Sequence, residues 1–362
     1  MNVIIKVTRN CNLRCNYCNE WRNKQTVMNI EVLANIISKV LNCSSMKSVN
    51  FIWHGGEPLL CGQEYYKKIL YIQEKCNKKN VKISNSIQTN GVLLNKSWIE
   101  FLKKYNFNIG LSLDGPRELH DEQRLMVDNT SAFDATMDAI KILQEYNVPY
   151  GILSVVTKKS LNFGAKKIFD FFIENNIKDF AFLQQQPKEK PIGECYTDDD
   201  FINIDNFNNF MKQIFDLWID YDDTNIKIRE FNSIITMLLG GVSSICTLGG
   251  RCIGRNIGID TNGDIYHCDE CRNDSTYKLG NIINDNLDEI LTGNKIKKII
   301  QNNRDRTLQY KGCKECKWSS MCHGGCPRAT YVNSDLYNNY CEYSALFEHI
   351  HKEIVSRLED IV

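Results

Sequence analysis

The sequence predicts an α/β fold built on an incomplete barrel of parallel strands, followed by a small cysteine-rich domain. Over residues 1–184, short β-rich runs alternate with longer segments in which apolar residues recur every three or four positions. This alternation is typical of βα units, which form parallel sheets. Six such units are fewer than the eight of a closed barrel, so we expect a partial (β/α)6 TIM-type barrel.

Each expected strand is a run of six or seven residues rich in apolar or β-branched side chains. The six runs cover residues 2–7, 48–53, 82–88, 107–113, 150–156 and 179–184. Amphipathic helices are expected between them, among others at residues 30–41, 95–105 and 132–145. Because parallel barrels carry their chemistry at the carboxyl ends of the strands, motifs that directly follow a strand are the first candidates for a site.

The chain changes character after the sixth strand. Residues 185–200 are polar and rich in turn formers, which predicts a surface loop over the barrel mouth. Helices are expected at 203–221 and 342–360, with little periodicity over 224–245. We therefore divide the chain into a barrel domain (1–225), a linker (226–245) and a cysteine-rich domain (246–362), in which bound metal substitutes for a large apolar core.

Composition excludes several classes of protein. The 362 residues are 43% hydrophobic and 24% charged, as in water-soluble globular proteins. Lys plus Arg and Asp plus Glu both total 44, so no excess positive charge favours nucleic acid or a membrane surface. The sequence shows neither a signal peptide nor an apolar run of about 20 residues, and we expect a cytoplasmic protein.

Cysteine is unusually frequent, with 16 residues, and in a reducing compartment this indicates metal binding or catalysis. Three cysteines, Cys11, Cys15 and Cys18, follow the first strand. Because structural metal sites normally have four protein ligands, three thiols indicate a centre with one position open to substrate. The alternative is a zinc site that takes a distant fourth ligand.

The pattern CxxxCxxC after the first strand of a βα barrel resembles that of the radical S-adenosylmethionine (SAM) enzymes. The resemblance implies a [4Fe–4S] cluster on these three thiols, with its fourth iron bound by the amino and carboxylate groups of SAM. Reductive cleavage of SAM would then give methionine and a 5′-deoxyadenosyl radical, which abstracts a hydrogen atom from the substrate. The protein would orient the reactants and exclude competing reactions.

Motifs after the next strands support this resemblance. His54-Gly55-Gly56-Glu57-Pro58 is similar to the GGEP motif of the family, in which backbone without side chains approaches the SAM amino group. Further segments follow strands three and four, at 88–91 and 111–116. The resemblance implies that Ser112 and Arg124 hold the SAM carboxylate and that Tyr17, Gly56 and Leu183 line the nucleoside. For Asp114, Gly115 and Pro116, ordinary turn chemistry is an equally good interpretation.

Eight more cysteines lie between positions 246 and 341, and their spacing resembles that of the SPASM domain of peptide- and protein-modifying radical SAM enzymes. The resemblance implies two auxiliary [4Fe–4S] clusters, three in all. The first would use Cys246, Cys252, Cys268 and Cys326, and the second Cys313, Cys316, Cys322 and Cys341. Two zinc ribbons are the alternative. Cys271 and Cys195 stay unassigned.

Asp269 directly follows one of these expected cluster ligands. A carboxylate there could remove a proton from a substrate radical and so promote loss of its electron. The same position carries the proposed general base in the anaerobic sulfatase-maturating enzymes. A loop carboxylate that accepts backbone hydrogen bonds is the alternative.

The chain resembles the anaerobic sulfatase-maturating enzymes over most of its length, including the segments at 215–218, 278–282 and 316–326. These enzymes oxidise a Cys or Ser residue to formylglycine. Asn19-Glu20 and His54 stand where those enzymes usually carry aromatic residues and Gln. Because HGGEP is widespread among maturases of ribosomally made peptides, we place peptide oxidation, cross-linking or epimerisation first and sulfatase maturation second.

Partners follow from these two hypotheses. Both imply a peptide or protein substrate and a reducing electron donor such as a flavodoxin or ferredoxin. Because the first strand starts at residue 2, we expect no leader-recognition domain and allow for a separate leader-binding protein. An iron–sulfur electron carrier without SAM chemistry and a zinc-stapled binding protein are the alternatives from other classes.

Overall fold

The computed structural model describes residues 1–22, 24–186, 202–250, 252–271, 275–309, 311–326, 341 and 343–359. The chain forms two compact units, each assembled from several segments. Unit 1 comprises Met1–Ser112, Arg124–Tyr150 and Ile253–Asn302, and unit 2 comprises Leu113–Gln123, Gly151–Cys252 and Asn303–Val362. Most of the predicted loop 185–200, including Cys195, lies outside the described residues.

Unit 1 is organised around four parallel strands that match the first four predicted strands to within two residues. They are β1 (Asn2–Thr8), β2 (Ser48–Gly55), β3 (Lys82–Thr89) and β4 (Phe107–Ser112). Each pairs in parallel with the next along the chain. Their carboxyl ends therefore meet at one edge of the sheet, where the motifs follow.

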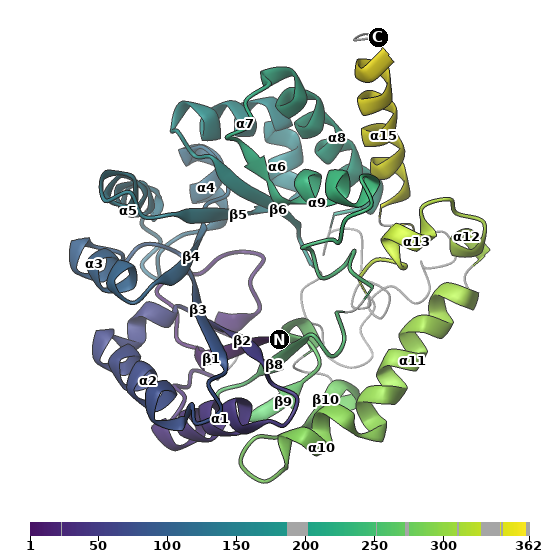
Figure 1. The fold of residues 1–362 in the computed structure, drawn as a ribbon. Helices are drawn as coiled ribbons and strands as arrows, with labels where there is room; N and C mark the ends of the chain where they lie inside the picture. Colours follow the sequence, from purple (N-terminus) through teal and green to yellow (C-terminus); the bar gives the residue numbers. More distant parts are fainter. Residues whose placement is uncertain are drawn as a thin grey trace. The chain divides into compact units, whose positions relative to one another are not determined.

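Three short strands, β8 (Asn256–Ile259), β9 (Asp264–Tyr266) and β10 (Lys278–Asn281), extend this sheet beyond β1. Strand β8 runs parallel to β1, whereas β9 and β10 form antiparallel pairs (Figure 1). Sequence analysis did not predict them because each is only three or four residues long, too short for an alternation pattern. They bring part of the cysteine-rich segment into unit 1.

The two faces of this sheet differ in chemistry. One face is apolar: Val3, Ile5, Phe51 and Trp53 are 0% exposed. Because side chains alternate along a strand, the opposite face carries a different set. Asn2 donates to Asn256 (2.8 Å), and the hydroxyls of Ser84 and Ser86 donate to Asn50 Oδ1 (3.1 and 2.9 Å). This second face is the more polar of the two, in contrast to the branched apolar layers that fill ordinary barrels.

Helices follow the strands in unit 1 as expected. Among them are α1 (Ile30–Asn42), α2 (Gln63–Cys76), α3 (Lys96–Lys104), α5 (Phe133–Glu145) and α10 (Leu287–Thr292), while α11 (Asn294–Gln309) continues into unit 2. Helix α1 shows the cause: the Asn29 side chain accepts the backbone N–H groups of Glu31 and Val32, and apolar residues spaced three and four apart are buried.

Unit 2 contains the parallel strands β5 (Tyr150–Val156, whose first residue belongs to unit 1), β6 (Asp179–Gln184) and β7 (Lys227–Ile228). Its helices are α4 (Arg117–Gln123), α6 (Lys158–Phe163), α7 (Ala165–Glu174), α8 (Ile204–Tyr221), α9 (Arg229–Leu238), α12 (Lys311–Lys314), α13 (Ser319–Cys322) and α15 (Ser344–Glu359). Helix α9 lies in the region for which the sequence predicted little periodicity. Its apolar pattern is weak because the helix buries only a short stripe that includes Phe231 and Ile234.

Three helix-to-strand turns share one solution. Asn106, Asn147 and Asn176 have φ of 54°, 50° and 53°, the left-handed region in which Asn is the best tolerated residue after Gly. Each ends a helix shortly before the next strand of the chain. Among the described residues, none of the helices combines the length and the apolar character needed to cross a membrane.

Candidate active site

Three cysteines lie on the loop that leaves β1 (residues 9–19), which we call the cysteine loop. Cys11, Cys15 and Cys18 pack in one apolar cluster with Leu13 and Ala132. Two of the sulfurs accept backbone hydrogen bonds at 3.4 Å, Cys11 from Leu13 N–H and Cys18 from Glu20 N–H. The loop therefore gathers three soft donors in a partly dry environment, as expected from CxxxCxxC.

This donor set fits an iron–sulfur cluster with one open corner. Burial raises the pKa of Cys11 to about 12 and also raises that of Cys18, so these thiols need a bound cation to become thiolates. Among the described residues, no three His, Cys, Asp or Glu side chains already converge on a metal position.

The loop after β2 lies directly on the cysteine loop, and two glycines make this possible. Gly56 N–H donates to Thr8 O and Glu57 N–H donates to Asn10 O, both at 2.8 Å. A Cβ atom on Gly55 or Gly56 would lie 2.0 or 2.2 Å from the carbonyl oxygen of Thr8 or Asn10. Packing against the β1 loop thus explains why this motif needs both glycines.

Glu57 is fully buried and its carboxylate is used by protein donors. It accepts hydrogen bonds from Leu59 N–H (2.9 Å), Thr89 Oγ1–H (2.7 Å) and Asn90 N–H (2.8 Å). Burial raises its pKa to about 7 in spite of these donors. Glu57 therefore joins the loops after β2 and β3, and Asn90 in turn donates to Asn12 (2.8 Å) on the cysteine loop.

Arg124 and Tyr17, both expected at the SAM site, lie together beside Cys15. The guanidinium carbon of Arg124 is 5.3 Å from the centre of the Tyr17 ring, and its Nη1 is 4.0 Å from Cys15 Sγ. Arg124 is only 6% exposed. A buried cation beside an aromatic face is a suitable partner for a carboxylate.

Ser112 ends β4, where its hydroxyl accepts a hydrogen bond from Gln88 Nε2 (3.1 Å). Gly110 leaves room for this contact, because a Cβ there would lie 2.1 Å from Gln88 Oε1. Leu183 lies on β6 of unit 2 and is 37% exposed. The roles expected for Ser112 and Leu183 toward SAM stay predictions.

Asp114 has a structural explanation within unit 2. It is 0% exposed, and its carboxylate accepts hydrogen bonds from Val155 N–H (3.0 Å) and Gln123 Nε2 (3.4 Å). Its own carbonyl accepts the Ser154 hydroxyl at 3.2 Å. These contacts favour the interpretation of Asp114 as a residue that braces β5.

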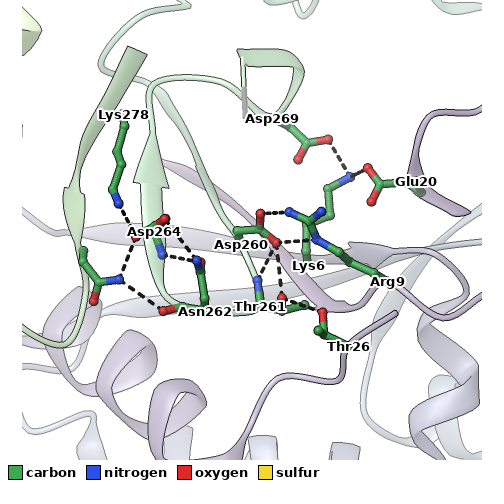
Figure 2. A network of polar contacts seen from close by, with 11 residues as sticks. Lys6, Arg9, Glu20, Thr26, Asp260, Thr261, Asn262, Asp264, Asp269 and Lys278 are labelled. Atoms are coloured by element: carbon green, nitrogen blue, oxygen red, sulfur yellow. Dashed lines mark hydrogen bonds and ion pairs between the residues drawn. The ribbon is translucent and has the colours of Figure 1, made fainter. Parts of the chain in front are cut away.

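Asp269, the expected base, is part of a polar cluster that also includes Lys6, Glu20 and His54. Lys6 Nζ lies 2.8 Å from Asp269 Oδ2 and 3.1 Å from Glu20 Oε1, and Figure 2 shows both ion pairs. The same nitrogen lies 3.0 Å from His54 Nδ1. Asp269 begins the short helix η3 (Asp269–Cys271) and Glu20 begins η1 (Glu20–Arg22).

Sequence analysis missed Lys6, although a signal was present. It is the only charged residue within the apolar run NVIIKV, and it occupies a position that alternates with the buried Ile5 and Val7. An ionisable side chain inside a buried strand needs a partner of opposite charge. A second pair, Arg9 with Asp260, lies close to this cluster in Figure 2, with Arg9 Nε 3.1 Å from Asp260 Oδ1.

The C-terminal cysteines are distributed over both units. Cys268 belongs to unit 1, where its neighbour Cys271 is 1% exposed. The pKa of Cys268 is raised, mainly by a hydrogen bond between the two side chains and also by burial. The other seven expected ligands, Cys246, Cys252, Cys313, Cys316, Cys322, Cys326 and Cys341, belong to unit 2. Cys313 and Cys316 are joined by a turn in which Cys316 N–H donates to Cys313 O (3.4 Å). The assignment of these cysteines to two clusters stays a prediction.

Comparison with known families identifies two domains in the chain. The radical SAM superfamily matches residues 5–161, and SPASM, an iron–sulfur cluster-binding domain, matches residues 246–317. The chain is 33% identical to the cysteine-type anaerobic sulfatase-maturating enzyme of Clostridium perfringens (strain 13 / Type A), over 100% of this chain and 99% of the relative. It is 31% identical to the serine-type enzyme of Bacteroides thetaiotaomicron, over 94% of this chain and 86% of that protein.

A solved structure of native anSMEcpe with bound AdoMet and Kp18Cys peptide has the same fold. The two structures agree with a TM-score of 0.85 at 31% identity, over 99% of this chain and 98% of the other. This agreement confirms the α/β class and the partial TIM barrel followed by a SPASM domain. The chain therefore belongs to the radical SAM superfamily and, within it, to the SPASM-domain maturases that include the anaerobic sulfatase-maturating enzymes.

Proposed function

We propose that the chain oxidises the β-carbon of a Cys or Ser residue in a peptide or protein substrate to an aldehyde. Two relatives that are named anaerobic sulfatase-maturating enzymes, one cysteine-type and one serine-type, align with nearly the whole chain. The observation that carries the proposal is the Asp269 carboxylate, held 2.8 Å from a buried ammonium in the same unit as the three-cysteine loop. These comparisons favour the second of the two substrate hypotheses from the sequence.

The cofactors would be SAM and three [4Fe–4S] clusters. Cys11, Cys15 and Cys18 would hold the cluster that binds SAM, and the eight C-terminal cysteines would hold the other two. When bound, these groups supply a one-electron route to hydrogen-atom abstraction. The protein would contribute Arg124 for a carboxylate, Tyr17 for an aromatic contact, and Gly55, Gly56 and Glu57 for the shape of the loops.

The oxidation removes two hydrogens from the substrate, and they leave by different routes. One leaves the β-carbon as a hydrogen atom. The proton of the thiol or hydroxyl would pass to Asp269, and the remaining electron to an iron–sulfur acceptor. A Ser side chain gives the aldehyde directly, whereas a Cys side chain gives a thioaldehyde that water converts to the aldehyde with release of hydrogen sulfide.

A second function, maturation of a ribosomally made peptide by cross-linking or epimerisation, is favoured by one observation. Glu20 and His54, which stand where the sulfatase maturases usually carry other residues, both contact the ammonium that holds Asp269. The surroundings of the base therefore differ from those expected for a sulfatase maturase. A flavodoxin or ferredoxin as electron donor, a separate leader-binding protein and a cytoplasmic location stay predictions.

Matched peptides distinguish the two functions. The anaerobically loaded protein is incubated with SAM, a strong reductant and a sulfatase-derived peptide that carries Cys, Ser or Ala at the target position. We expect an aldehyde, captured by a hydrazine reagent and located by mass spectrometry, from the Cys or the Ser peptide and none from the Ala peptide. A new bond between two residues, or an inverted centre without an aldehyde, would instead establish the second function.

A further inference from the structure

Lys6 is an almost inaccessible cation in the middle of a polar cluster. Its side chain is 1% exposed, and its ammonium meets Asp269, Glu20 and His54 at 2.8, 3.1 and 3.0 Å. An ammonium has three N–H donors, and two of these three neighbouring groups are carboxylates of opposite charge. The two carboxylates therefore compensate the charge of the ammonium, which is the condition for keeping a buried Lys charged.

The three acceptors come from separate segments of unit 1. Asp269 follows β9, Glu20 follows the cysteine loop, and His54 is the residue of β2 that pairs with Lys6 in the sheet. Close packing allows Asp269 to reach this position, because a Cβ on Gly258 would lie 2.9 Å from its backbone nitrogen and Cα. Lys6 thus connects the expected base to the two positions that depart from the sulfatase-maturase pattern.

The geometry also fixes the tautomer of His54. Its Nδ1 accepts the backbone N–H of Gly55 at 2.8 Å and contacts Lys6 Nζ at 3.0 Å. Both partners are donors, so Nδ1 acts as an acceptor and the neutral ring carries its hydrogen on Nε2. His54 consequently cannot replace Lys6 as a cationic partner of Asp269 without losing both contacts.

Among the three charged side chains of this cluster, Asp269 is the most accessible. Its side chain is 13% exposed, compared with 8% for Glu20 and 1% for Lys6. Lys6 and Glu20 therefore form the buried part of the cluster, and Asp269 is the carboxylate that a substrate could reach. In Figure 2 the Lys6 side chain ends between the two carboxylates.

We propose that Lys6 is a positioning residue that fixes the Asp269 carboxylate for proton transfer, and that Glu20 and His54 set the place of Lys6. This inference rests on the proposed function, in which Asp269 receives a substrate proton. Lys6 itself would not touch the substrate. Without Lys6, hydrogen-atom abstraction should still occur, but the resulting substrate radical should be converted to product inefficiently.

The test compares Lys6→Met, Lys6→Arg, Asp269→Asn and the double variant Lys6→Met/Asp269→Asn. The measured quantity is the amount of modified peptide formed per 5′-deoxyadenosine. For Lys6→Met we expect this ratio to fall about tenfold and the product rate about 100-fold, with the peptide KM within about threefold of wild type. Lys6→Arg should restore part of the ratio, and the double variant should be no worse than Asp269→Asn.

Lys39→Met is a matched control, because Lys39 donates to the carbonyls of Ile283 and Asp285 in the same unit, away from this cluster. It should leave the ratio unchanged. A parallel loss of 5′-deoxyadenosine and product in Lys6→Met, or effects of Lys6→Met and Asp269→Asn that multiply, would overturn the proposal. If Lys6→Met does not fold, Glu20→Gln and His54→Ala replace it, and a ratio unchanged in both overturns the proposal.

The ratio is counted with whichever product the wild-type protein forms. A wild-type protein that forms a cross-link would contradict the proposed aldehyde chemistry and would still permit the test of Lys6. A further readout needs no turnover: in the cluster-free protein, the ¹⁵N NMR signal of the Lys6 ammonium should shift in Asp269→Asn. A signal that does not move would contradict the ion pair.

Discussion

The two groups of cysteines differ in how the polypeptide holds them. The N-terminal loop is connected to the barrel by the backbone of the GGEP segment, by Asn90 and by Arg124. In the described part of the C-terminal region, Cys313, Cys316 and Cys322 lie in short turns and one-turn helices, with Trp318 as the buried apolar anchor between them. The polypeptide thus shapes the N-terminal loop by its own contacts, and we expect the C-terminal cysteines to depend more on what their thiols bind.

The largest expected effect tests the first half of this comparison. Cys15→Ala should lower formation of 5′-deoxyadenosine at least about 1,000-fold, because the open-corner cluster loses a ligand. The midpoint of thermal unfolding of the metal-free protein should shift little, since the loop keeps its backbone contacts. Liquid chromatography and calorimetry measure the two quantities, and a variant that cleaves SAM normally would refute the assignment of Cys15.

Asp269→Asn should lower peptide oxidation by about 100- to 1,000-fold, because an amide cannot accept the substrate proton. Cleavage of SAM should continue, so 5′-deoxyadenosine would accumulate without product. Asp264→Asn is a suitable control, as Asp264 contacts Lys278 and Asn281 on the neighbouring strand. Equal losses of SAM cleavage and product would argue against a role as base.

Trp318→Ala tests the second half of the comparison, the C-terminal group of cysteines. The Trp318 ring stacks on Phe347 with centroids 5.6 Å apart, and its Nε1–H donates to Glu348 at 3.2 Å. We expect a loss of about 3 kcal/mol in the free energy of unfolding, typical of removing a buried Trp. In urea titrations, the free energy of unfolding should fall by more in the metal-free than in the loaded protein. Equal losses would mean that bound metal does not stabilise this region.

Glu57→Gln concerns stability rather than activity, and its effect depends on pH. Because burial raises the pKa of Glu57 from 4.5 to about 7, the folded protein binds its proton more tightly than the unfolded chain does. The protonated Glu57 side chain therefore makes its full contribution to the free energy of unfolding below pH 4.5. This contribution, about 3 kcal/mol, is lost as the pH rises to 7.

The Gln variant lacks this titration. The difference in unfolding free energy between wild type and Glu57→Gln should therefore fall between pH 4.5 and 7 in urea titrations of the metal-free protein. A difference that does not vary with pH would show that the carboxylate is not desolvated. The N-terminal loop would then depend less on its buried contacts than the comparison states.

Much of the fold could be predicted from the sequence, because strong patterns had a local cause. The first six strands follow from β-branched runs, and helix α1 follows from its apolar spacing and the Asn29 cap. Strands β8–β10 could not be predicted, because they are stabilised by pairing with β1 and with each other rather than by their own residues. Helix α9 was missed because its buried stripe is short.

The site divides in the same way. Cys11, Cys15 and Cys18 could be singled out because three cysteines fall within one loop, and Tyr17 and Arg124 because a family motif marks them. The structure places these side chains close together, and their roles toward a cluster and SAM stay predictions. Lys6 and Arg9 could not be assigned, because their partners Asp269 and Asp260 lie far away in the sequence. A contact across the sheet leaves no local signal, apart from the charge within an apolar strand.

The most direct test of the proposed oxidation follows the hydrogen atom itself. A peptide with deuterium on the β-carbon of its target Cys is incubated with the loaded protein, SAM and reductant, and 5′-deoxyadenosine is analysed by mass spectrometry. We expect deuterium in 5′-deoxyadenosine together with an aldehyde in the peptide. Modified peptide with no transfer of deuterium from that carbon would contradict the proposed oxidation.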